Sequence, residues 1–172
     1  MKHDGAVLAV LVFNGQSIAN QAGARAANEM FMGLARRIQR QVGVVNPVGR
    51  YYDSCFVCLV ETIDATVWLR TLALRLACAL RRPMDVGTAA GPRLEILPDI
   101  GVGVVHLNRL HEDLDDALYL AERMATAARS TPSRTAMLDP ATREVVPVEQ
   151  AQLGPRRMPH PARGTGGRRL RH

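Results

Sequence analysis

The sequence predicts an α+β fold, in which helices pack against a mixed β-sheet. Three observations lead to this prediction: a continuous apolar run near the N-terminus, two apolar runs joined by a tight reversal, and amphipathic segments with helical spacing. The chain has 172 residues, of which 47% are apolar. A single globular domain of this length buries roughly 68% of the surface that its unfolded chain exposes, so a hydrophobic core suffices without disulfides.

The first part of the chain predicts a strand followed by a long helix. Residues 6–13, AVLAVLVF, form an unbroken run that favours β-structure, which is the pattern of a strand covered on both faces. Residues 14–17 are a polar break. Apolar residues then recur every three to five positions between Ile18 and Ile38. We expect one helix of about six turns that ends near Arg40.

A hairpin follows, with an unusual turn. Residues 42–51 and 55–60 predict its two strands, and Pro47 marks an edge or a bulge in the first of them. The reversal lies within VGRYYDSCFVCLV and carries Tyr-Tyr-Asp-Ser. Two-residue hairpin loops favour Asn-Gly, Asp-Gly or Gly-Gly, because these pairs reach positive φ. Because residues 51–54 contain no glycine or asparagine, we expect the turn to differ from the common two-residue hairpin loops.

The remaining segments complete an alternating order of strands and helices. We expect a helix that starts at Thr62 or Asp64 and stops at Pro83, followed by a small hairpin over 84–96. A strand over 99–106, a helix from Asp113 to Ala128 and a strand over 134–138 come next. The order β-α-β-β-α-β-α-β is that of ferredoxin-like and polymerase-palm sheets, in which two helices lie on one face.

Two details of these segments can be checked directly. Trp68 falls on the apolar stripe of its helix, which predicts a core position. The strand over 99–106, DIGVGVVH, has glycines where another backbone must pass closely. The acidic run 112–116 is either a cation site or a helix start favoured by the helix dipole, and the dipole is the simpler interpretation.

The net charge of +6 belongs to the C-terminus. Six of the 22 basic residues follow Gly154, where there is no acid, and the 16 that remain match the 16 acidic residues of 1–153. We expect a disordered basic tail over 154–172, because this segment has little apolar content with which to offset the entropy of ordering. The predicted organisation is a domain over 1–139, an extension over 140–153 and this tail.

The number of cysteines and the lengths of the apolar runs indicate the cellular compartment of the protein. Three cysteines are too few and too odd in number for a disulfide framework, which favours a reducing compartment. Cys55-x-x-Cys58 suggests a redox or zinc site, but strand residues three apart point to opposite faces, which favours buried thiols. Residues 6–13 are too short for a membrane span of about 20 residues. We expect a cytoplasmic protein or the cytoplasmic part of a membrane protein.

The order of elements and several local patterns resemble the GGDEF domain of bacterial diguanylate cyclases, from residue 6 to about 139. IANQAGARAANE (18–29) lies where the family has I-N-D-x-x-G-H-x-x-G-D, and RYYDSCF (50–56) lies on R-x-G-G-D-E-F. IGVGV (100–104) matches S-I-G-V-A, and LDDALYLAERMATAARS (114–130) matches the final helix. The resemblance implies a palm-like fold and a site that, in the family, makes cyclic di-GMP from two GTP molecules with divalent metal.

At the signature, the residues of this chain depart from the family. Tyr52 and Asp53 replace the two glycines, Ser54 replaces the aspartate, and Cys55 replaces the glutamate, while Phe56 is retained. The glycines let the backbone approach a nucleotide, and a tyrosine side chain takes up that space. The end of the first strand, where the family has a metal-binding aspartate, reads Leu-Val-Phe (11–13). These side chains offer none of the hard oxygen ligands that Mg²⁺ needs.

Other family positions are also changed. The asparagine and aspartate that read guanine correspond to Ala19 and Asn28, and the basic residue that reaches phosphate from the last helix corresponds to Arg129. The R-x-x-D of the family's product-inhibition site corresponds to residues 43–46, Gly-Val-Val-Asn, which lack the arginine needed for a bidentate grip.

The resemblance therefore predicts a degenerate GGDEF-like domain without catalytic or metal residues, acting as a regulatory or protein-interaction module in cyclic di-GMP signalling. We expect a homodimer or a signalling protein partner, no specific nucleic acid, no membrane span in this chain and no cofactor; a membrane-anchored parent protein stays open.

Two alternatives stay open as well. One is an active diguanylate cyclase, or a sensor of GTP or cyclic di-GMP, with a modified site. Its residues would be those at the family positions: Asn28, Tyr52, Asp53, Ser54 and Arg129. Mg²⁺ and GTP are expected only in that case. The other is an unrelated α+β domain whose likeness is topological alone.

Overall fold

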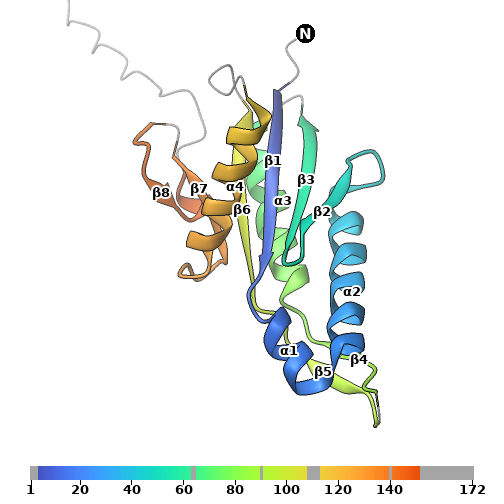
Figure 1. Ribbon diagram of the computed structural model, residues 1–172. Helices are drawn as coiled ribbons and strands as arrows, with labels where there is room; N and C mark the ends of the chain where they lie inside the picture. The colour runs from blue at the N-terminus through green and yellow to red at the C-terminus, as the bar shows by residue number, and fades with distance from the viewer. Residues whose placement is uncertain (1–3, 63–64, 90, 108–112, 140, 152–172) are drawn as a thin grey trace, which may run out of the picture.

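A computed structural model describes residues 4–62, 65–89, 91–107, 113–139 and 141–151. Its main sheet has six strands in the order β2-β3-β1-β6-β7-β8 (Figure 1). The strands are β1 (Asp4–Val12), β2 (Val48–Tyr52), β3 (Cys55–Thr62), β6 (Ile100–Leu107), β7 (Thr135–Leu138) and β8 (Val145–Val146). β6 and β7 are parallel and the other neighbours are antiparallel. The prediction of an α+β fold with a mixed sheet is confirmed.

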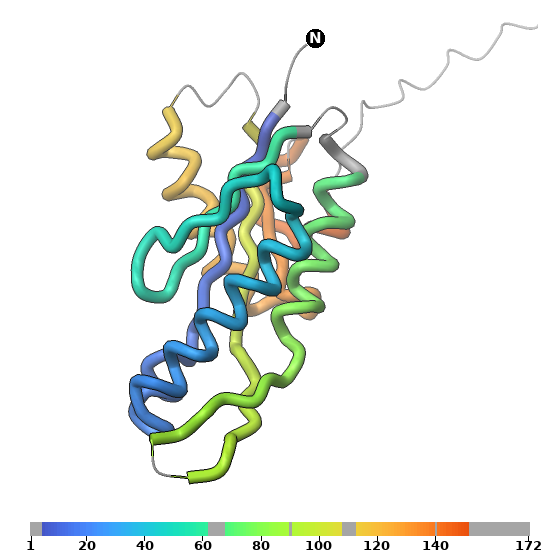
Figure 2. Tube along the Cα trace, turned by 90° about the vertical axis from the view of Figure 1, so that its right-hand side faces the viewer, coloured from blue at the N-terminus to red at the C-terminus, as the bar shows by residue number. Residues whose placement is uncertain are grey.

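Helices cover both faces of this sheet. They are α1 (Gly15–Ala22), α2 (Ala24–Val42), α3 (Ala65–Leu80), α4 (Leu114–Ala128) and the short 3₁₀ helix η1 (Val148–Gln150). Figure 2 shows α2 and α3 side by side on one face and α4 on the other. The predicted small hairpin is also present, as a separate pair of strands, β4 (Met84–Val86) and β5 (Leu94–Ile96).

β1 lies at the centre of the sheet and contributes to the core on both faces. Its even-numbered residues Ala6, Leu8 and Val10 pack with α2 and α3, whereas its odd-numbered residues Val7 and Ala9 pack with α4. All five have no exposed surface. Because successive strand side chains point to opposite faces, an unbroken apolar run is what a strand covered on both faces requires. This sequence prediction is confirmed.

The predicted single helix over 18–40 is wrong, because the chain forms two helices separated by Gly23. Gly23 has φ of 94°, a left-handed conformation that interrupts the helix and that glycine adopts without a steric cost. α2 also runs further than expected and ends at Val42, where it is followed by Gly43 with φ of 84°. The Asn46 side chain donates to the Val42 carbonyl over 2.5 Å and so caps the helix end. β2 consequently starts at Val48 rather than at residue 42.

The core position predicted for Trp68 is also wrong, since 40% of its surface is exposed. Almost every position of α3 is apolar or small, so spacing alone does not identify its buried face. The buried stripe of the helix leaves Trp68 out, although it keeps the expected Leu72, Leu76 and Leu80; its other members are Leu69, Ala73 and Ala77. Within the described residues, no helix is both long enough and apolar enough to cross a membrane.

Residues 141–151 pack against the sheet and α3. β8 pairs with β7 at the sheet edge. Val148 and Ala151 are buried in the core cluster that α2 and α3 form with the sheet. The Arg70 guanidinium donates to the Ala151 carbonyl over 2.6 Å. This part of the chain, which the sequence sets apart as an extension, therefore completes one edge of the core.

The three cysteines differ sharply in exposure. Cys55 and Cys58 are both fully buried and lie on opposite faces of the sheet, as their spacing predicts, whereas Cys78 is exposed. Burial raises the pKa of Cys58 to about 12, with a smaller contribution from Cys55. A buried, protonated thiol is a poor nucleophile.

We therefore expect iodoacetamide to alkylate only Cys78 in the folded protein at about pH 8. Intact-mass measurement should show one adduct in buffer and three in denaturant. Cys78→Ser is the matched control and should show none before unfolding. Rapid native modification of Cys55 or Cys58 would contradict this arrangement of the sheet.

Candidate functional site

The residues at the family's signature positions lie on the β2–β3 turn, against the end of β1. The Val12 amide donates to the Ser54 carbonyl over 2.9 Å, which continues the sheet into the turn. The next amide, of Phe13, donates to the Asp99 carbonyl over 2.8 Å at the start of β6. The turn and the adjoining ends of β1 and β6 thus meet at one end of the sheet (Figure 1).

The turn is formed without glycine. The strand register shifts between Arg50 and Tyr52, which leaves Tyr51 as a bulge. The Arg50 guanidinium donates twice to the Asp53 carbonyl, over 2.5 and 3.2 Å, and so bridges the turn. Among the described residues no turn residue from Tyr52 to Ser54 has positive φ. A bulge and an arginine side chain therefore replace the backbone conformation that Asn-Gly would supply.

Tyr52 connects the turn to α4. Its hydroxyl donates to Glu122 over 2.5 Å, and its ring lies 5.6 Å from the Tyr51 ring, centroid to centroid. Burial and this hydrogen bond raise the pKa of Tyr52. Burial, followed by the nearby Glu122 charge, raises the pKa of the Cys55 thiol to about 11. Both groups therefore stay protonated at neutral pH and offer no anionic ligand to a cation.

Tyr52→Phe should loosen the turn because it removes the hydroxyl that binds Glu122. The pair is solvent-exposed, so we expect a loss of only about 0.5–1 kcal/mol in the free energy of unfolding. Amide hydrogen exchange should quicken across residues 50–55. Tyr51→Phe is the control, because the Tyr51 hydroxyl makes no hydrogen bond within the described residues. Equal exchange rates in both variants would contradict the proposed anchoring.

Asn28 lines a cavity of about 420 Å³ between α2 and β2. The aromatic rings of Phe31 and Phe56 lie in its wall, and the Arg50 guanidinium lies 4.3 Å above the Phe31 ring. Tyr52 is not among the residues that line it. The Tyr52 side chain turns toward α4 instead, so it does not fill the cavity beside Asn28. The cavity has the size of a small-molecule site.

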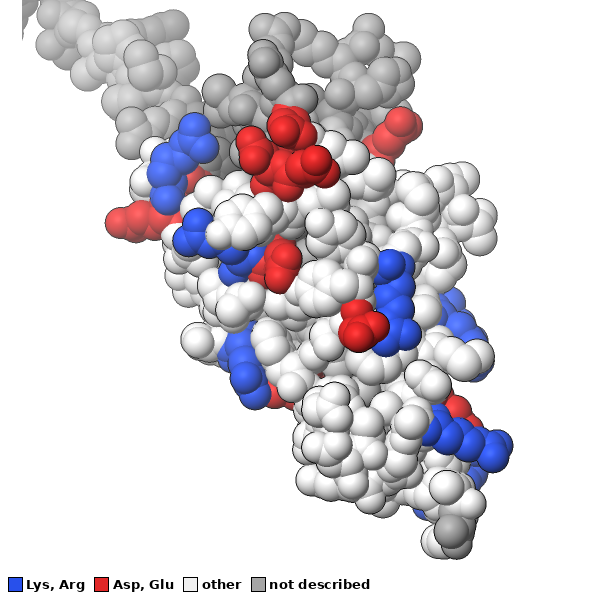
Figure 3. Space-filling model, in the orientation of Figure 1, with Lys and Arg blue, Asp and Glu red and all other residues white. Residues whose placement is uncertain are grey.

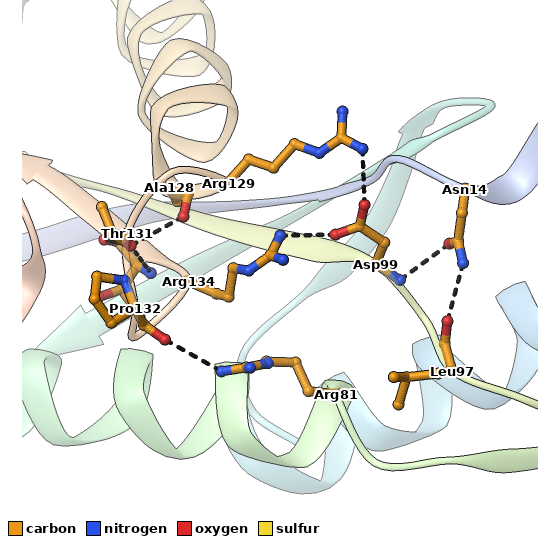
Figure 4. Close-up of polar contacts among 10 residues, drawn as sticks. Asn14, Arg81, Leu97, Asp99, Ala128, Arg129, Thr131, Pro132 and Arg134 are labelled. Atoms are coloured by element: carbon orange, nitrogen blue, oxygen red, sulfur yellow. Dashed lines mark hydrogen bonds and ion pairs between the residues drawn. The ribbon is translucent and has the colours of Figure 1, made fainter.

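Arg129 lies at the C-terminal end of α4 and is already paired. Its guanidinium is 4.6 Å from the Phe13 ring and donates to Asp99 over 2.9 Å. Arg134 donates to the other oxygen of Asp99 over 2.7 Å. The Asp99 amide donates to Asn14, whose side-chain amide donates in turn to the Leu97 carbonyl (Figure 4). Asp99 thus neutralises part of the charge with which Arg129 would meet a phosphate.

Sequence reasoning found the turn and Arg129 but missed their partners. Glu122 and Asp99 carry no local signal, because each meets its partner across 30 to 70 residues of chain. Arg50 could have been identified, since it stands three residues before Asp53 in a turn that lacks glycine. The acidic residue Asp113 caps α4 by accepting from the Asp115 amide over 2.9 Å, which confirms its expected role at a helix start.

The residues present at this end of the sheet do not fit a divalent metal. Leu11 and Val12 are buried apolar side chains, and Cys55 is a buried thiol. The neighbouring carboxylates, Glu122 and Asp99, accept hydrogen bonds from Tyr52 and from two arginines. Among the residues that the structure describes, no three His, Cys, Asp or Glu side chains are grouped so that they could hold a metal ion. Mg²⁺ needs several hard oxygen ligands in octahedral geometry, whereas Asp53 is the one carboxylate that the turn itself supplies.

Comparison with known proteins rests on structure. No family model and no curated protein matches the sequence. A GGDEF domain from Pseudomonas aeruginosa has a TM-score of 0.64 and 22% identity, over 80% of this chain and 85% of its own. The EAL/GGDEF domain protein from M. capsulatus has a TM-score of 0.63 and 20% identity, over 74% and 79%. The GGEEF domain of a diguanylate cyclase from Vibrio cholerae, described as active, has a TM-score of 0.60 and 16% identity, over 73% and 76%. The chain therefore has the fold of GGDEF domains.

Proposed function

We propose that this chain is a non-catalytic GGDEF-like module that regulates, or binds, another component of cyclic di-GMP signalling. The observation that carries the proposal is the position of Cys55. It takes the place of the signature glutamate and is fully buried opposite Leu11 of β1 rather than directed at a ligand. A cytoplasmic location is part of this proposal.

The energetics of phosphoryl transfer support the proposal. Positioning and neutralisation of phosphate charge supply most of the catalysis, and metal ions are central to both. Loss of one electrostatic stabiliser commonly costs about 3–4 kcal/mol in activation free energy. Here the positions of the metal-binding acids hold Ser54, Cys55 and apolar residues, so several such contributions are absent together.

The direct test is to incubate the purified chain with GTP and Mg²⁺ or Mn²⁺ and to measure cyclic di-GMP by mass spectrometry. We expect no product above that of a heat-denatured sample. Product that disappears in Ser54→Ala or Asn28→Ala would overturn the proposal and establish the alternative, an active cyclase with a modified site.

A second candidate function, nucleotide sensing, is favoured by the cavity beside Asn28. The Asn28 amide makes no hydrogen bond within the described residues, and Arg50 and Phe31 offer a cation and a ring for stacking. Isothermal titration with GTP and with cyclic di-GMP, each with Mg²⁺, tests it. Micromolar binding that is lost in Asn28→Ala, but kept in the exposed control Asn20→Ala, would assign a sensing role; absence of binding leaves the interaction module.

An exposed apolar face supports the partner-binding part of the proposal. Tyr51, Leu59 and Leu114 are 54%, 37% and 48% exposed, and they line a groove between the β2–β3 strands and α4. Figure 3 shows this side of the molecule as largely uncharged, with acidic side chains gathered at one end. Exposed apolar patches of this kind commonly mark protein interfaces.

We propose a second copy of this chain as the partner on that face. Sedimentation velocity should show a dimer that dissociates in Leu59→Ser, whereas Leu94→Ser, at an equally exposed leucine of β5, should leave it intact. A monomer at all concentrations would assign the face to a different signalling protein.

A further inference from the structure

A second cavity, away from the GGDEF signature positions, has the properties of an anion site. Its volume is about 610 Å³, and it lies between the end of α3, the β5–β6 connection and the α4–β7 connection. Arg81, Arg82 and Arg134 line it, together with apolar side chains. It shares no lining residue with the cavity beside Asn28. We refer to it below as the arginine groove.

The charges of the arginine groove are incompletely neutralised. Its one acidic residue, Asp99, is already bound by Arg134 and, from outside the groove, by Arg129. Arg81 donates only to the neutral carbonyl of Pro132, over 3.3 Å. Figure 4 shows Arg81 extending from α3 toward the connection that carries Arg134, so the two guanidinium groups approach the groove from different elements.

Arg82 has no counter-ion in the part of the chain that the structure describes. Its side chain makes no hydrogen bond or ion pair there, although its carbonyl accepts from Arg37 over 2.6 Å. Burial, and then repulsion by Arg82 and Arg40, lower the pKa of Arg37. Like charges therefore gather at the end of α3, where an anion would be attracted.

Apart from Ser133, the remaining wall of the arginine groove is apolar. Leu97 is 61% exposed, and Leu74 and the buried Ile100 lie with it in the wall. An apolar surface beside three guanidinium groups matches a ligand that has an apolar body and an anionic group. The volume is that of a small-molecule site, typically about 300–1,000 Å³. Guanidinium groups bind phosphate through paired, charge-assisted hydrogen bonds.

We propose that the arginine groove binds a small organic phosphate. The phosphate would lie against Arg81, Arg82 and Arg134, and a flat apolar portion of the ligand would pack on Leu74 and Leu97. This inference does not depend on the proposed signalling function, because it uses none of the residues at the signature.

Cys78 provides a reporter for this site. It lines the groove and is the one exposed cysteine, since Cys55 and Cys58 are buried. The experiment measures the rate at which a disulfide reagent reacts with Cys78 in the presence of 2-naphthyl phosphate. We expect saturating probe to slow the reaction by about fivefold or more, because ligands in such pockets lose most of their surface to the protein.

The variants separate a phosphate site from general binding. Arg82→Gln should raise the probe concentration needed for protection by about tenfold, as expected for loss of one charge-assisted hydrogen bond. Arg36→Gln is the matched control, because Arg36 is exposed on α2 outside the groove, and it should leave protection unchanged. Substitution of Arg82 removes no hydrogen bond or ion pair of the described fold, so loss of folding does not confuse the result.

Three results would overturn the proposal. They are no protection at about 10 mM probe, equal protection in the double variant Arg81→Gln/Arg82→Gln, and equal protection by uncharged 2-naphthol. Amide chemical shifts provide an independent check. Shifts confined to residues 74–82, 97–100 and 133–134 support the arginine groove, and shifts centred on Asn28 would refute it.

Discussion

Gly103→Ala is expected to destabilise the protein by ~3 kcal/mol or more in the free energy of unfolding. A Cβ atom at position 103 of β6 would overlap the Ala121 carbonyl oxygen and the Ala125 amide nitrogen of α4, and it would lie 2.9 Å from the carbonyl carbon of Met124. These are backbone atoms, so no side-chain rotation relieves the overlap. The helix must shift from the sheet, and contacts of α4 with β1 and β6 are lost together.

The control for this prediction is Gly49→Ala in β2. A Cβ atom there meets no heavy atom within 4 Å, and Gly49 has no positive φ. We expect a change of about 0.5–1 kcal/mol at most, in the stabilising direction, because alanine restricts the unfolded chain. Urea unfolding of both variants measures the difference. A Gly103→Ala protein as stable as Gly49→Ala would mean that α4 does not lie this close to β6.

Leu34→Ala is expected to cost ~2–5 kcal/mol in the free energy of unfolding. Leu34 has no exposed surface and lies in the core cluster between α2 and the sheet. Alanine favours helix at least as well as leucine, so the loss reports the cavity left in the core rather than helix propensity. The midpoint of urea unfolding should fall while its slope stays the same.

Met32→Ala on the same helix is the matched control. Met32 is 57% exposed, and its truncation should change the unfolding free energy by less than about 0.5 kcal/mol. Equal losses at both positions would show that α2 presents a different face to the sheet. Because α2 also carries Asn28, the Leu34→Ala protein should bind any ligand of that cavity more weakly near its unfolding midpoint.

Much of the fold could be predicted because backbone hydrogen bonding and burial impose simple periods on the sequence. The unbroken run of β1, the alternation that separates Cys55 from Cys58, and the glycines of β6 each have one structural interpretation. Trp68 shows that the spacing of apolar residues does not always identify the buried face of a helix. Where nearly every residue of a helix is apolar, the buried face is decided by the neighbours that pack on it.

The position of the candidate site could be predicted from the sequence, whereas the contacts of its side chains could not. The turn at residues 52–54 follows from the strands on either side of it, and the residue types that it carries are read directly from the sequence. The orientation of Tyr52 is different. Whether it enters the cavity beside Asn28 or turns to α4 depends on Glu122, which stands 70 residues away. A single sequence contains no signal for that pairing.

By itself, then, the sequence determined the order of the elements from β2 to β7, the two-sided burial of β1 and the residue types available for chemistry, but neither the helix break at Gly23 nor the edge strand β8. Only the tertiary structure decided which polar side chains meet: Asp99 pairs with Arg129 and Arg134, and Glu122 accepts from Tyr52. It also leaves Arg82 with no counter-ion among the described residues. The physical reason is the separation along the sequence of the residues that interact. Period and propensity act within a few residues, whereas an ion pair or a cavity joins side chains that only the folded chain brings within a few ångströms.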